Sequence, residues 1–523
     1  MNIMLLLEMA AGAAPDRLAL GRRADGLTYE RLYDHAGRAA AAFDAMGVGR
    51  VVYAAQASPT LPVALFGAAW SGLPFVPVNY RLADDRLRAI VAGQAPAVVL
   101  CDDGGGERLA GIDGARTVSV SKLTTQLGGV EPRATEWSPD PDEVAVLLHT
   151  SGTSGTPKAA VLRHRHLSSY VLGSVEFLGA GEDEATLVSV PPYHIAGIVA
   201  ILTAVYGGRR LVQLPSFAAD EWVRTARREQ VTHAMTVPTM LARILDVLDP
   251  ATGGDGAGLT SVRHLSYGGG RMPVPVIERA MGLLPGVDFV NAYGLTETSS
   301  SVAVLTPEDH RAALAGADPD GRARLGSVGR PLPTVEITVR DRDGVEVAPL
   351  THGEVWVRGE QVSGEYAGSA TGGDGWFRTN DEGWFDSSGY LFIEGRLDDV
   401  IVRGGENLSP GEIEDVVLGH PAVRDCAVVG VPDDEWGEVV ALAVVVRDGM
   451  AVGEADLADH VVAHLRSTRR PALVVMRAEL PVNDAGKVVR RALRDDLAAV
   501  YRARTGDSPG ARSPGRPERT EER

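Results

Sequence analysis

The stretch VAVLLHTSGTSGTPK, residues 144–158, joins an apolar run to a loop of glycine, serine and threonine that ends in Pro157 and Lys158. The run 144–150 is typical of a strand buried in a parallel sheet, because it is almost continuously apolar. Repeated glycines let backbone N–H groups approach phosphate oxygens, while the hydroxyls and the lysine supply further donors. The stretch therefore predicts a strand followed by a phosphate-binding loop.

The spacing of this loop differs from that of the Walker A loop. Lys158 follows Gly155 by three positions, with Pro157 between them, whereas the Walker lysine directly follows a glycine. A P-loop NTPase is therefore disfavoured. Taken alone, the pattern would also fit a Ser/Gly-rich surface loop, so the other motifs have to decide.

The remainder of the first 290 residues indicates an α/β fold. Strand-like runs at residues 51–55, 97–101 and 232–237 alternate with helical patterns, which predicts βαβ units and parallel sheets. One helix is expected to begin after Thr28 as its N-cap and to end at Gly47. Its core face is expected to carry Leu32, Ala36, Ala39, Ala40 and Phe43. Beyond residue 326, short alternating runs with the turn pairs Asp343-Gly344 and Ser388-Gly389 predict antiparallel hairpins and a β subdomain.

The length of the chain and its local sequence patterns predict the domain organisation. A chain of 523 residues is too long for one ordinary core. We expect a large N-terminal domain, residues 1–396, with parallel-sheet βαβ layers and the β subdomain. A small mobile α+β domain is expected over residues 397–503, with a helix at 410–418. Residues 504–523 are rich in Pro, Gly, Ser and charge, which predicts a disordered tail.

Composition narrows the functional class. The formal charge of −18 and pI near 5.2 lack the positive field that nucleic acid or an anionic membrane requires. Only Cys101 and Cys426 are present, outside any C-x-x-C pattern, which argues against a disulfide framework and favours the cytoplasm. The apolar opening is interrupted by Glu8 and is too short to span a bilayer, so we interpret it as the first helix.

A second motif, NAYGLTET at residues 291–298, points to the same chemistry as the phosphate loop. Together the two resemble signatures of the adenylate-forming superfamily, which includes acyl-CoA synthetases, luciferases and nonribosomal adenylation domains. The resemblance implies that Tyr293 flanks adenine, Thr296 contacts the α-phosphate and Glu297 helps to hold Mg²⁺. A carboxylate is a hard oxygen ligand suited to that ion.

Two further segments fit this resemblance. Tyr267 and the following glycines 268–270 match a run that separates adenine from the acyl pocket in the family. The segment 379–381 matches the family's Thr-Gly-Asp motif, whose aspartate, here Asp381, would accept hydrogen bonds from ribose. Asn380 departs from the pattern, since it replaces the usual glycine.

The segment that joins the domains, residues 395–414, is the most extensive match. The resemblance implies that Arg396 contacts ribose or phosphate and that Asp398 is the hinge. Gly404 and Gly405 would line the pantetheine tunnel, although Arg403 stands where many relatives have a smaller residue. Rotation about a hinge is chemically reasonable, because adenylation and thiol transfer need different groups around one carbonyl.

Lys487 is the expected catalytic lysine of adenylation. It lies in PVNDAGKVVR, residues 481–490, which matches the family's terminal motif. A carboxylate and the α-phosphate repel each other, and an ammonium group between them offsets that repulsion. The chain has only two other lysines, Lys122 and Lys158, so the retention of lysine at Lys158 and Lys487 favours a need for a compact charge.

The acyl and CoA sites are marked by single residues. By resemblance, His194 in PPYHIAG gates the acyl pocket and contacts the carboxylate, and Trp436 would stack on the CoA adenine. The same PPYHIAG segment lacks the aspartate that clamps an α-amino group in amino-acid-activating relatives, so amino acids are disfavoured as substrates. The apolar run 195–208 is most simply a buried helix.

These assignments give one expected set of site residues. The catalytic residues are expected to be Lys487, Glu297, Thr296 and His194. The ATP-binding residues are expected to be Thr150, Ser151, Gly152, Thr153, Ser154, Lys158, Gly268, Gly269, Gly270, Asn291, Ala292, Tyr293, Gly294, Asp381 and Arg396. The acyl pocket is expected to involve His194, Tyr267, Gly268 and Gly294. CoA is expected at Gly404, Gly405 and Trp436, and Mg²⁺ at Glu297.

The resemblance covers about residues 28–497 and implies an AMP-forming acid–thiol ligase that uses ATP, Mg²⁺ and CoA. Three alternatives stay open: a ligase that loads a carrier protein's phosphopantetheine, an enzyme that activates another oxyanion such as nitrite for condensation with an aromatic amine, and a regulatory protein on a degenerate scaffold. The last is disfavoured because Lys487, Glu297 and Lys158 are all present. The motifs leave the acid, the acceptor and the oligomeric state open.

Overall fold

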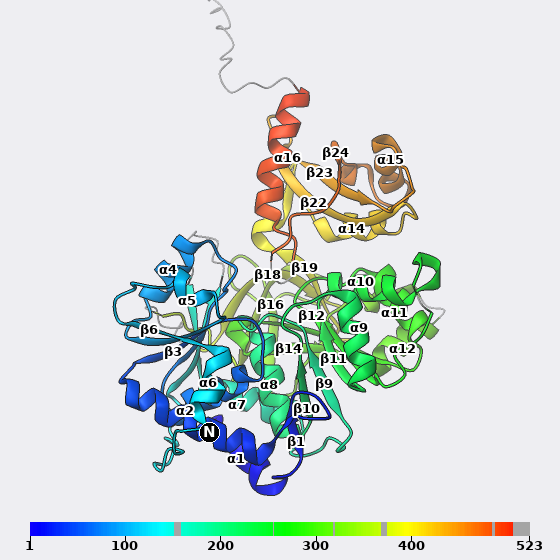
Figure 1. Cartoon of the computed structure of the whole chain (residues 1–523). Helices are drawn as coiled ribbons and strands as arrows, with labels where there is room; N and C mark the ends of the chain where they lie inside the picture. Colours follow the sequence, from blue (N-terminus) through cyan, green and yellow to red (C-terminus); the bar gives the residue numbers. More distant parts are fainter. Residues whose placement is uncertain (151–157, 255, 317–318, 368–373, 484–486, 506–523) are drawn as a thin grey trace, which may run out of the picture. The chain divides into compact units, whose positions relative to one another are not determined.

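The computed structural model describes residues 1–150, 158–254, 256–316, 319–367, 374–483 and 487–505 (Figure 1). The chain divides into two compact units, Met1–Ile393 and a second unit that comprises Glu394–Asn483 and continues from Lys487. The predicted α/β fold class is confirmed. Within the described ranges, none of the helices is both long and apolar enough to cross a membrane.

A six-stranded sheet forms the first layer of unit 1, in the order β6-β5-β3-β4-β7-β8. Its strands are β3 (Arg50–Ala54), β4 (Phe75–Pro77), β5 (Ala97–Cys101), β6 (Ala115–Ser119), β7 (Val144–Thr150) and β8 (Lys158–Arg163). Its helices are α2 (Tyr29–Met46), α3 (Thr60–Ser71), α4 (Asp84–Ala92), α5 (Gly105–Arg108) and α6 (Val120–Leu127). The strands are parallel except for β8, which pairs antiparallel with β7.

Helix α2 shows how the local sequence sets an element. The Thr28 side chain accepts a hydrogen bond from the backbone N–H of Arg31, 3.3 Å away, and caps the helix as predicted. Gly47 ends the helix with a φ of 62°, a conformation that glycine adopts without strain. Leu32 and Phe43 lie on the buried face. The predicted limits and core face of this helix are confirmed.

A nine-stranded sheet forms the second layer, in the order β15-β14-β13-β12-β11-β9-β10-β1-β2. Its strands are β1 (Leu18–Leu20), β2 (Leu27–Thr28), β9 (Ala185–Val188), β10 (Arg210–Gln213), β11 (His233–Thr236), β12 (His264–Gly268), β13 (Asp288–Leu295), β14 (Ser300–Leu305) and β15 (Arg330–Pro331). From β13 to β1 in this order, each strand is parallel to the next. The carboxyl ends of these strands therefore share one edge of the sheet.

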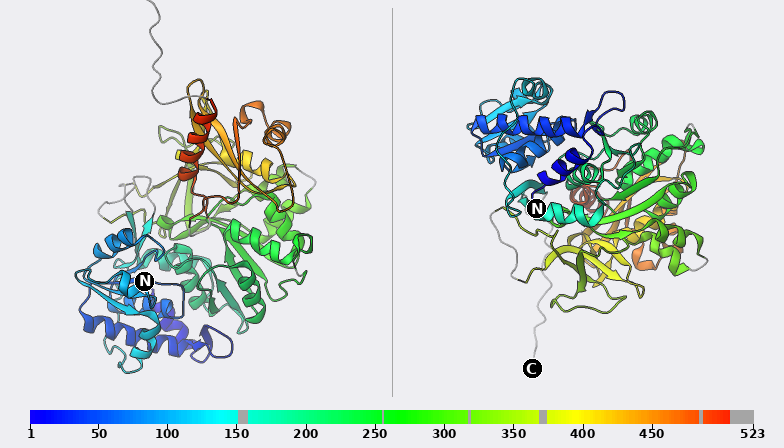
Figure 2. Two further views of the ribbon diagram at one scale, coloured as in Figure 1. Left: turned by 45° about the horizontal axis from the view of Figure 1, so that its top comes forward. Right: turned by 90° about the horizontal axis from the view of Figure 1, so that it is seen from below.

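Helices cover both faces of this sheet. They are α1 (Met4–Ala13), α7 (His164–Ser174), α8 (Ile195–Gly207), α9 (Ala219–Arg228), α10 (Pro238–Leu248), α11 (Val274–Leu283), α12 (Pro307–Ala315) and α13 (Pro319–Ala323), with short 3₁₀ turns η1 (Pro250–Thr252), η2 (Thr296–Thr298) and η3 (Arg324–Gly326). Helices α9 to α12, drawn in green, gather on one side of the strands in Figures 1 and 2. Helix α8, with no charged side chain, packs with α1 and α7 on the other face.

The predicted antiparallel β subdomain is a four-stranded sheet at the end of unit 1, in the order β16-β17-β18-β19. Its strands are β16 (Val335–Arg340), β17 (Gly353–Gly359), β18 (Phe377–Phe385) and β19 (Leu391–Arg396). The two predicted turn glycines, Gly344 and Gly389, have φ values of 80° and 81°. Glycine is favoured there because other side chains strain this conformation.

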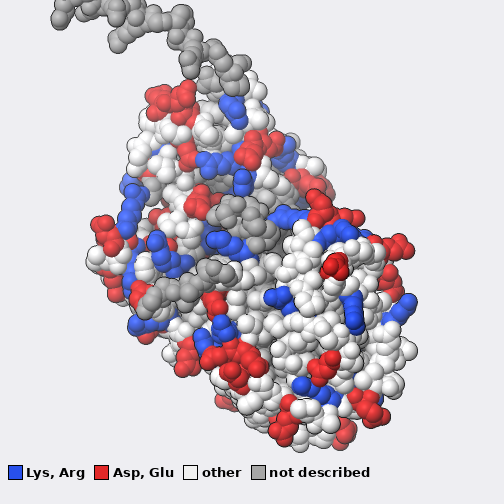
Figure 3. Space-filling model, turned by 90° about the vertical axis from the view of Figure 1, so that its left-hand side faces the viewer, with Lys and Arg blue, Asp and Glu red and all other residues white. Residues whose placement is uncertain are grey.

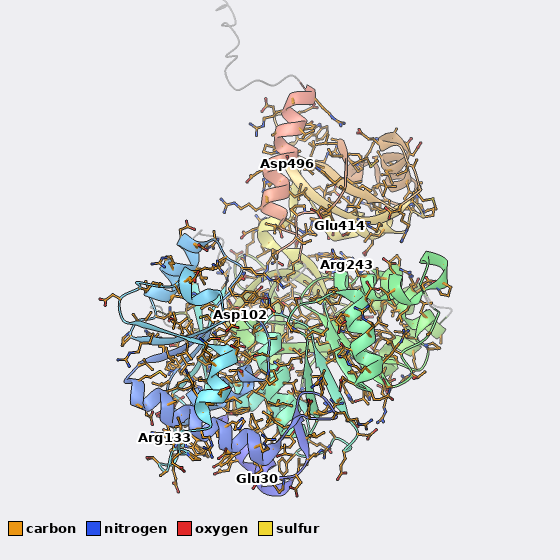
Figure 4. All side chains as sticks on the ribbon, viewed as in Figure 1. Glu30, Asp102, Arg133, Arg243, Glu414 and Asp496 are labelled. Carbon is orange, nitrogen blue, oxygen red and sulfur yellow. The ribbon has the colours of Figure 1, made fainter. Side chains whose placement is uncertain are left out.

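Unit 2 is a separate α+β fold with its own core. Its elements are η4 (Leu397–Asp399), β20 (Ile401–Arg403), β21 (Glu406–Leu408), α14 (Pro410–Leu418), β22 (Val423–Asp433), β23 (Gly437–Val446), α15 (Glu454–His464), η5 (Ser467–Arg469), β24 (Leu473–Arg477) and α16 (Arg490–Thr505). Glu414 on α14, labelled in Figure 4, forms an ion pair of 2.7 Å with Arg490, the first residue of α16, and so links the two helices.

The predicted disordered tail began two residues too early. Arg504 and Thr505 belong to α16, because the Arg504 guanidinium pairs with Glu454 at 2.7 Å and the Thr505 hydroxyl bonds to the carbonyl of Tyr501 at 3.0 Å. Residues 506–523 lie outside the described part of the chain.

Candidate functional site

The predicted phosphate loop connects two paired strands. Thr150 at the end of β7 is opposite Lys158 at the start of β8. Ser151, Gly152, Thr153 and Ser154 lie outside the described residues. Lys158 is exposed, and its Nζ lies 5.7 Å from the centre of the Tyr366 ring. The sheet therefore fixes the base of the loop and the position of its lysine.

The NAYGLTET motif forms the end of β13 and the turn η2. Glu297 lies in η2 with only 8% of its surface exposed. Its Oε1 accepts a hydrogen bond from the Tyr366 hydroxyl at 2.5 Å. The Thr298 hydroxyl closes the turn, since it accepts from the backbone N–H of Leu295 at 2.9 Å and donates to backbone oxygens. The turn therefore holds the Glu297 carboxylate in a fixed place.

The structure brings two predicted nucleotide contacts together. The Tyr293 hydroxyl donates to Oδ2 of Asp381 at 2.6 Å, although the residues are 88 positions apart. Asp381 is 5% exposed, and its backbone N–H donates to the hydroxyl of Thr379 at 3.1 Å. The carboxylate is thus held against the tyrosine by strands of two different sheets.

The backbone conformation of Asn380 explains why asparagine can stand where the family has glycine. Its φ is +61°, in the left-handed region that glycine adopts freely and asparagine tolerates better than most residues. Asparagine therefore keeps the β18 conformation that presents Asp381.

This gives a prediction for stability. Asn380→Ala should have a free energy of unfolding about 1 kcal/mol lower than that of Asn380→Gly, because alanine is strained at a positive φ that glycine adopts freely. Both variants lose the asparagine side chain, so their difference isolates the backbone. Chemical denaturation of the two variants measures it, and equal stability of Ala and Gly would contradict the argument.

The glycines predicted to bind the nucleotide differ in why glycine is needed at each position. A Cβ at Gly268 would overlap the carbonyl oxygen of Ala292, and one at Gly294 would overlap that of Ser300. Gly269 has a φ of +76°. At Gly270 the nearest atom to a Cβ is in Pro238, 3.8 Å away, so no protein atom there requires glycine. Of Gly268, Gly270 and Gly294, Gly270 is therefore the one where an added Cβ would meet no clash.

The prediction that Tyr267 lines the acyl pocket differs from the structure. Its ring is fully buried in the core beneath α10 and α11, and its hydroxyl bonds to Nε2 of His310 at 2.7 Å. His310 Nδ1 bonds in turn to the carbonyl of Thr306 at 2.7 Å, and burial lowers the pKa of His310. In strand β12 the side chain points to the face opposite the one reached by Ser266, so Tyr267 supports the wall from behind.

His194 and Asn291 take different places around the sheet edge. His194 directly precedes α8, and its ring centre lies 4.9 Å from that of Tyr193. Asn291 is 6% exposed and donates its side-chain N–H to the carbonyl of Ser327 at 2.9 Å. The Asn291 side chain is thus engaged with the backbone, and the role of His194 as a gate stays a prediction.

Unit 2 brings the predicted CoA residues together. Gly404 and Gly405 form the turn between β20 and β21, with φ values of 57° and 84°. The Gly404 N–H donates to the carbonyl of Trp436 at 2.8 Å, and a Cβ at Gly404 would lie 3.1 Å from the indole. Trp436 is 45% exposed, and the Arg403 guanidinium lies 5.4 Å from its ring centre. An exposed indole beside a glycine turn can stack on a planar ring.

The remaining predicted residues of unit 2 are Arg396, which ends β19, Asp398 and Lys487. Asp398 is in η4, which follows Arg396 directly. Lys487 is exposed, and its backbone is fixed by two bonds with Asn483, one from its N–H at 2.9 Å and one to its carbonyl at 2.7 Å.

Tyr366 is a residue that sequence reasoning missed. It contacts two predicted site residues, Glu297 and Lys158, through its hydroxyl and its ring. Its segment, EYAGSATGG, has the glycines of an ordinary loop, and no chemistry-bearing spacing singles out the tyrosine. Only the folded chain shows the contact.

The donor set at Glu297 fits Mg²⁺. Within the described ranges there is no group of three or more His, Cys, Asp or Glu side chains that could hold a metal alone. Mg²⁺ that arrives with ATP keeps waters and phosphate oxygens as ligands and needs only one or two carboxylates. A nearly buried carboxylate such as Glu297 also gains from a nearby cation.

Surface charge is mixed. On the face in Figure 3, lysine and arginine alternate with aspartate and glutamate. The net charge of −18 is therefore not gathered into one patch on that face.

Comparisons with known proteins cover nearly the whole chain. Residues 7–367 match the family model "AMP-binding enzyme", and residues 412–487 match "AMP-binding enzyme C-terminal domain". A fatty acid–[acyl-carrier-protein] ligase, ScoC of Streptomyces coeruleorubidus, is 32% identical and covers 90% of this chain and 91% of its own. An indoleacetate–CoA ligase of Aromatoleum aromaticum is 30% identical over 95% of this chain and 98% of its own.

Solved structures agree with the family models. The o-succinylbenzoate CoA synthetase of Bacillus subtilis, in complex with its acyl-adenylate intermediate, has a TM-score of 0.80 at 28% identity and covers 94% of this chain and 98% of its own. ATP-bound MatB of Rhodopseudomonas palustris has a TM-score of 0.83 at 28% identity, over 96% and 100% of the two chains. The chain belongs to the AMP-binding enzyme family and is an ATP-dependent acid–thiol ligase.

Proposed function

We propose that the enzyme converts a carboxylic acid with an uncharged, mainly apolar acyl tail to its acyl adenylate and then to a CoA thioester. The observation that carries the proposal is the hydrogen bond of 2.6 Å between Tyr293 and Asp381, because it sets the predicted adenine and ribose contacts side by side at the carboxyl end of β13. Ligands of open parallel sheets bind at this edge.

In the first half-reaction, a substrate carboxylate oxygen attacks the α-phosphorus of ATP in line. The new acyl–phosphate bond forms as the bond to the pyrophosphate oxygen breaks. Glu297 would hold Mg²⁺, and the ion would supply charge neutralisation of the triphosphate. Asp381 accepts from the ribose hydroxyls, Lys158 contacts phosphate, and Lys487 offsets the repulsion between carboxylate and phosphate. In the second half-reaction a thiolate attacks the acyl carbonyl, and AMP leaves.

The proposed class of acid is inferred from residues on one face of the nine-stranded sheet. Met235, Ser266 and Val290 are aligned neighbours on β11, β12 and β13, and each is partly exposed although the strands are central. The residues that alternate with them, Ala234, Leu265 and Phe289, are buried. The exposed row is uncharged, as is helix α8 on the same side. A charged acyl tail would lack a partner there.

CoA is the preferred acceptor, since indoleacetate–CoA ligase and 2-succinylbenzoate–CoA ligases are similar to this chain over most of its length. A carrier protein is the second candidate, favoured by the 32% identity to ScoC, a fatty acid–[acyl-carrier-protein] ligase. Both acceptors present a phosphopantetheine thiol. Both cysteines are unpaired and buried, which fits the reducing cytoplasm as the proposed location.

Rotation of unit 2 about Asp398 is proposed to exchange the groups around the acyl carbonyl between the two half-reactions. Asp398→Pro should slow thioester formation about tenfold or more while pyrophosphate release changes little. Proline fixes φ near −65°, a value compatible with the 3₁₀ turn η4, so the variant should fold with a stiffened hinge. Separate assays of the two half-reactions test this, and an equal loss in both would contradict the hinge.

The direct test is acid-dependent pyrophosphate release with Mg·ATP. The panel comprises aryl, short-chain and medium-chain acids, a dicarboxylic acid and nitrite, each with and without CoA, with AMP and thioester followed by mass spectrometry. Apolar acids that yield acyl-CoA would support the proposal. Acyl adenylate without acyl-CoA would favour a carrier protein, preference for the dicarboxylic acid or nitrite would overturn the acid class, and no release at all would overturn the activity.

A further inference from the structure

A short segment of unit 1, residues 363–367, continues the six-stranded sheet beyond β8. The backbone N–H of Val161 donates to the carbonyl of Glu365 at 2.9 Å, and the N–H of Ala367 donates to Ala159 at 2.8 Å. Tyr366 lies opposite Ala160 in an antiparallel bridge. The segment therefore adds an extended strip to the strand that begins with Lys158.

The same segment is fixed to the turn that carries Glu297. The carbonyl oxygen of Glu297 accepts from the backbone N–H groups of Ser363 at 2.8 Å and Gly364 at 3.2 Å. An ion pair of 2.9 Å between Arg163 and Glu365 adds a side-chain link to β8. Residues 363–367 thus connect η2 to β8, two elements that are far apart in the sequence.

The Tyr366 side chain contacts Glu297 on η2 and Lys158 on β8, the two elements that its segment connects. Its hydroxyl donates to Oε1 of Glu297 at 2.5 Å, and its ring centre lies 5.7 Å from Nζ of Lys158. A hydrogen bond to a carboxylate is stronger than one between neutral groups. A cation within about 6 Å of a ring face is attracted to it.

We propose that Tyr366 is a positioning residue for the nucleotide phosphates. Its hydroxyl orients the Glu297 carboxylate toward Mg²⁺, and its ring supports the Lys158 ammonium. This inference rests on the proposed function. The partners of a metal-binding carboxylate change metal affinity by about 10- to 100-fold when they are lost, because they fix its direction.

The role of the Tyr366 hydroxyl can be tested without disturbing the fold. The segment is held by backbone bonds of Ser363, Gly364, Glu365 and Ala367, none of which involves the Tyr366 side chain. Tyr366→Phe therefore keeps the segment and the ring beside Lys158, and it removes the hydroxyl that donates to Glu297. Tyr366→Leu removes the ring as well.

The experiment measures ATP binding by calorimetry over a series of Mg²⁺ concentrations and in excess EDTA. Tyr366→Phe should raise the Mg²⁺ concentration for half-maximal binding about 10- to 100-fold, with EDTA-measured affinity within about threefold of the natural protein. Tyr366→Leu should also weaken binding in EDTA, by about two- to fivefold. Tyr390→Phe is the matched control, because its hydroxyl donates to Asp309 at 2.6 Å, and its Mg²⁺ requirement should not change.

Each outcome decides a different point. An unchanged Mg²⁺ requirement in Tyr366→Phe, or an equal change in Tyr390→Phe, would overturn the positioning role. A loss in Tyr366→Phe that is the same with and without Mg²⁺ would also overturn it, because the hydroxyl would then act on ATP or on the fold. If the natural protein did not bind Mg·ATP, the proposed function itself would fail.

Discussion

Replacing Lys487 with alanine is expected to reduce acid-dependent pyrophosphate release by about 10²- to 10³-fold, the usual cost of losing one preorganised electrostatic contact. Thioester formation from supplied acyl adenylate should stay within about threefold of the natural rate. The ammonium charge offsets the repulsion between carboxylate and α-phosphate, and this repulsion is absent once the adenylate has formed. Following the two half-reactions separately measures the difference.

The described structure makes Lys487→Ala a clean test. The residue is exposed, and its two bonds to Asn483 involve its backbone, which alanine retains. Lys122→Ala on α6 is the matched control, because Lys122 is also exposed and lies in no motif. Lys487→Arg should recover only part of the activity, since a broad guanidinium does not reproduce a compact charge. An equal loss in both half-reactions would remove Lys487 from its assigned role.

Local chemistry made much of the fold predictable. Thr28 and Gly47 mark the ends of α2 because a cap hydroxyl and a left-handed glycine act within a few residues. The helix predicted at residues 410–418 has those limits as α14. The turn pairs at Gly344 and Gly389 likewise decide their hairpins locally. Elements set by neighbours in sequence can be read from sequence.

The site was less predictable because its contacts are long-range. Tyr293 and Asp381 both carried a motif, but their contact joins two sheets. Tyr366 carried none, and its role depends on a strand pairing that the sequence does not encode locally. The motif could not show where the Tyr267 side chain points, because neighbouring side chains of a strand point to opposite faces and only the packed helices decide which face is core.

Glu297→Gln is expected to lower pyrophosphate release by about 10²-fold at ordinary Mg²⁺ concentrations and to recover partly as Mg²⁺ is raised. The amide has nearly the same shape and its oxygen can still accept from Tyr366, so the main change is the loss of charge. The Glu297 carbonyl also keeps its bonds to Ser363 and Gly364, which should preserve the fold. Pyrophosphate release over a Mg²⁺ series measures the effect.

The comparison with a surface glutamate isolates that charge. Glu308→Gln on α12 removes an exposed carboxylate that pairs with Arg311 at 3.0 Å, and surface pairs contribute little, so its Mg²⁺ series should match the natural enzyme. Thioester formation from supplied acyl adenylate should be normal in both variants, because no pyrophosphate leaves in that step. If Glu297→Gln slowed both steps equally, or if added Mg²⁺ restored nothing, Glu297 would be shaping the turn η2 and another group would hold the ion. Because Tyr366 reaches Mg²⁺ only through this carboxylate, its Phe variant should then leave the Mg²⁺ requirement unchanged, so the two experiments check each other.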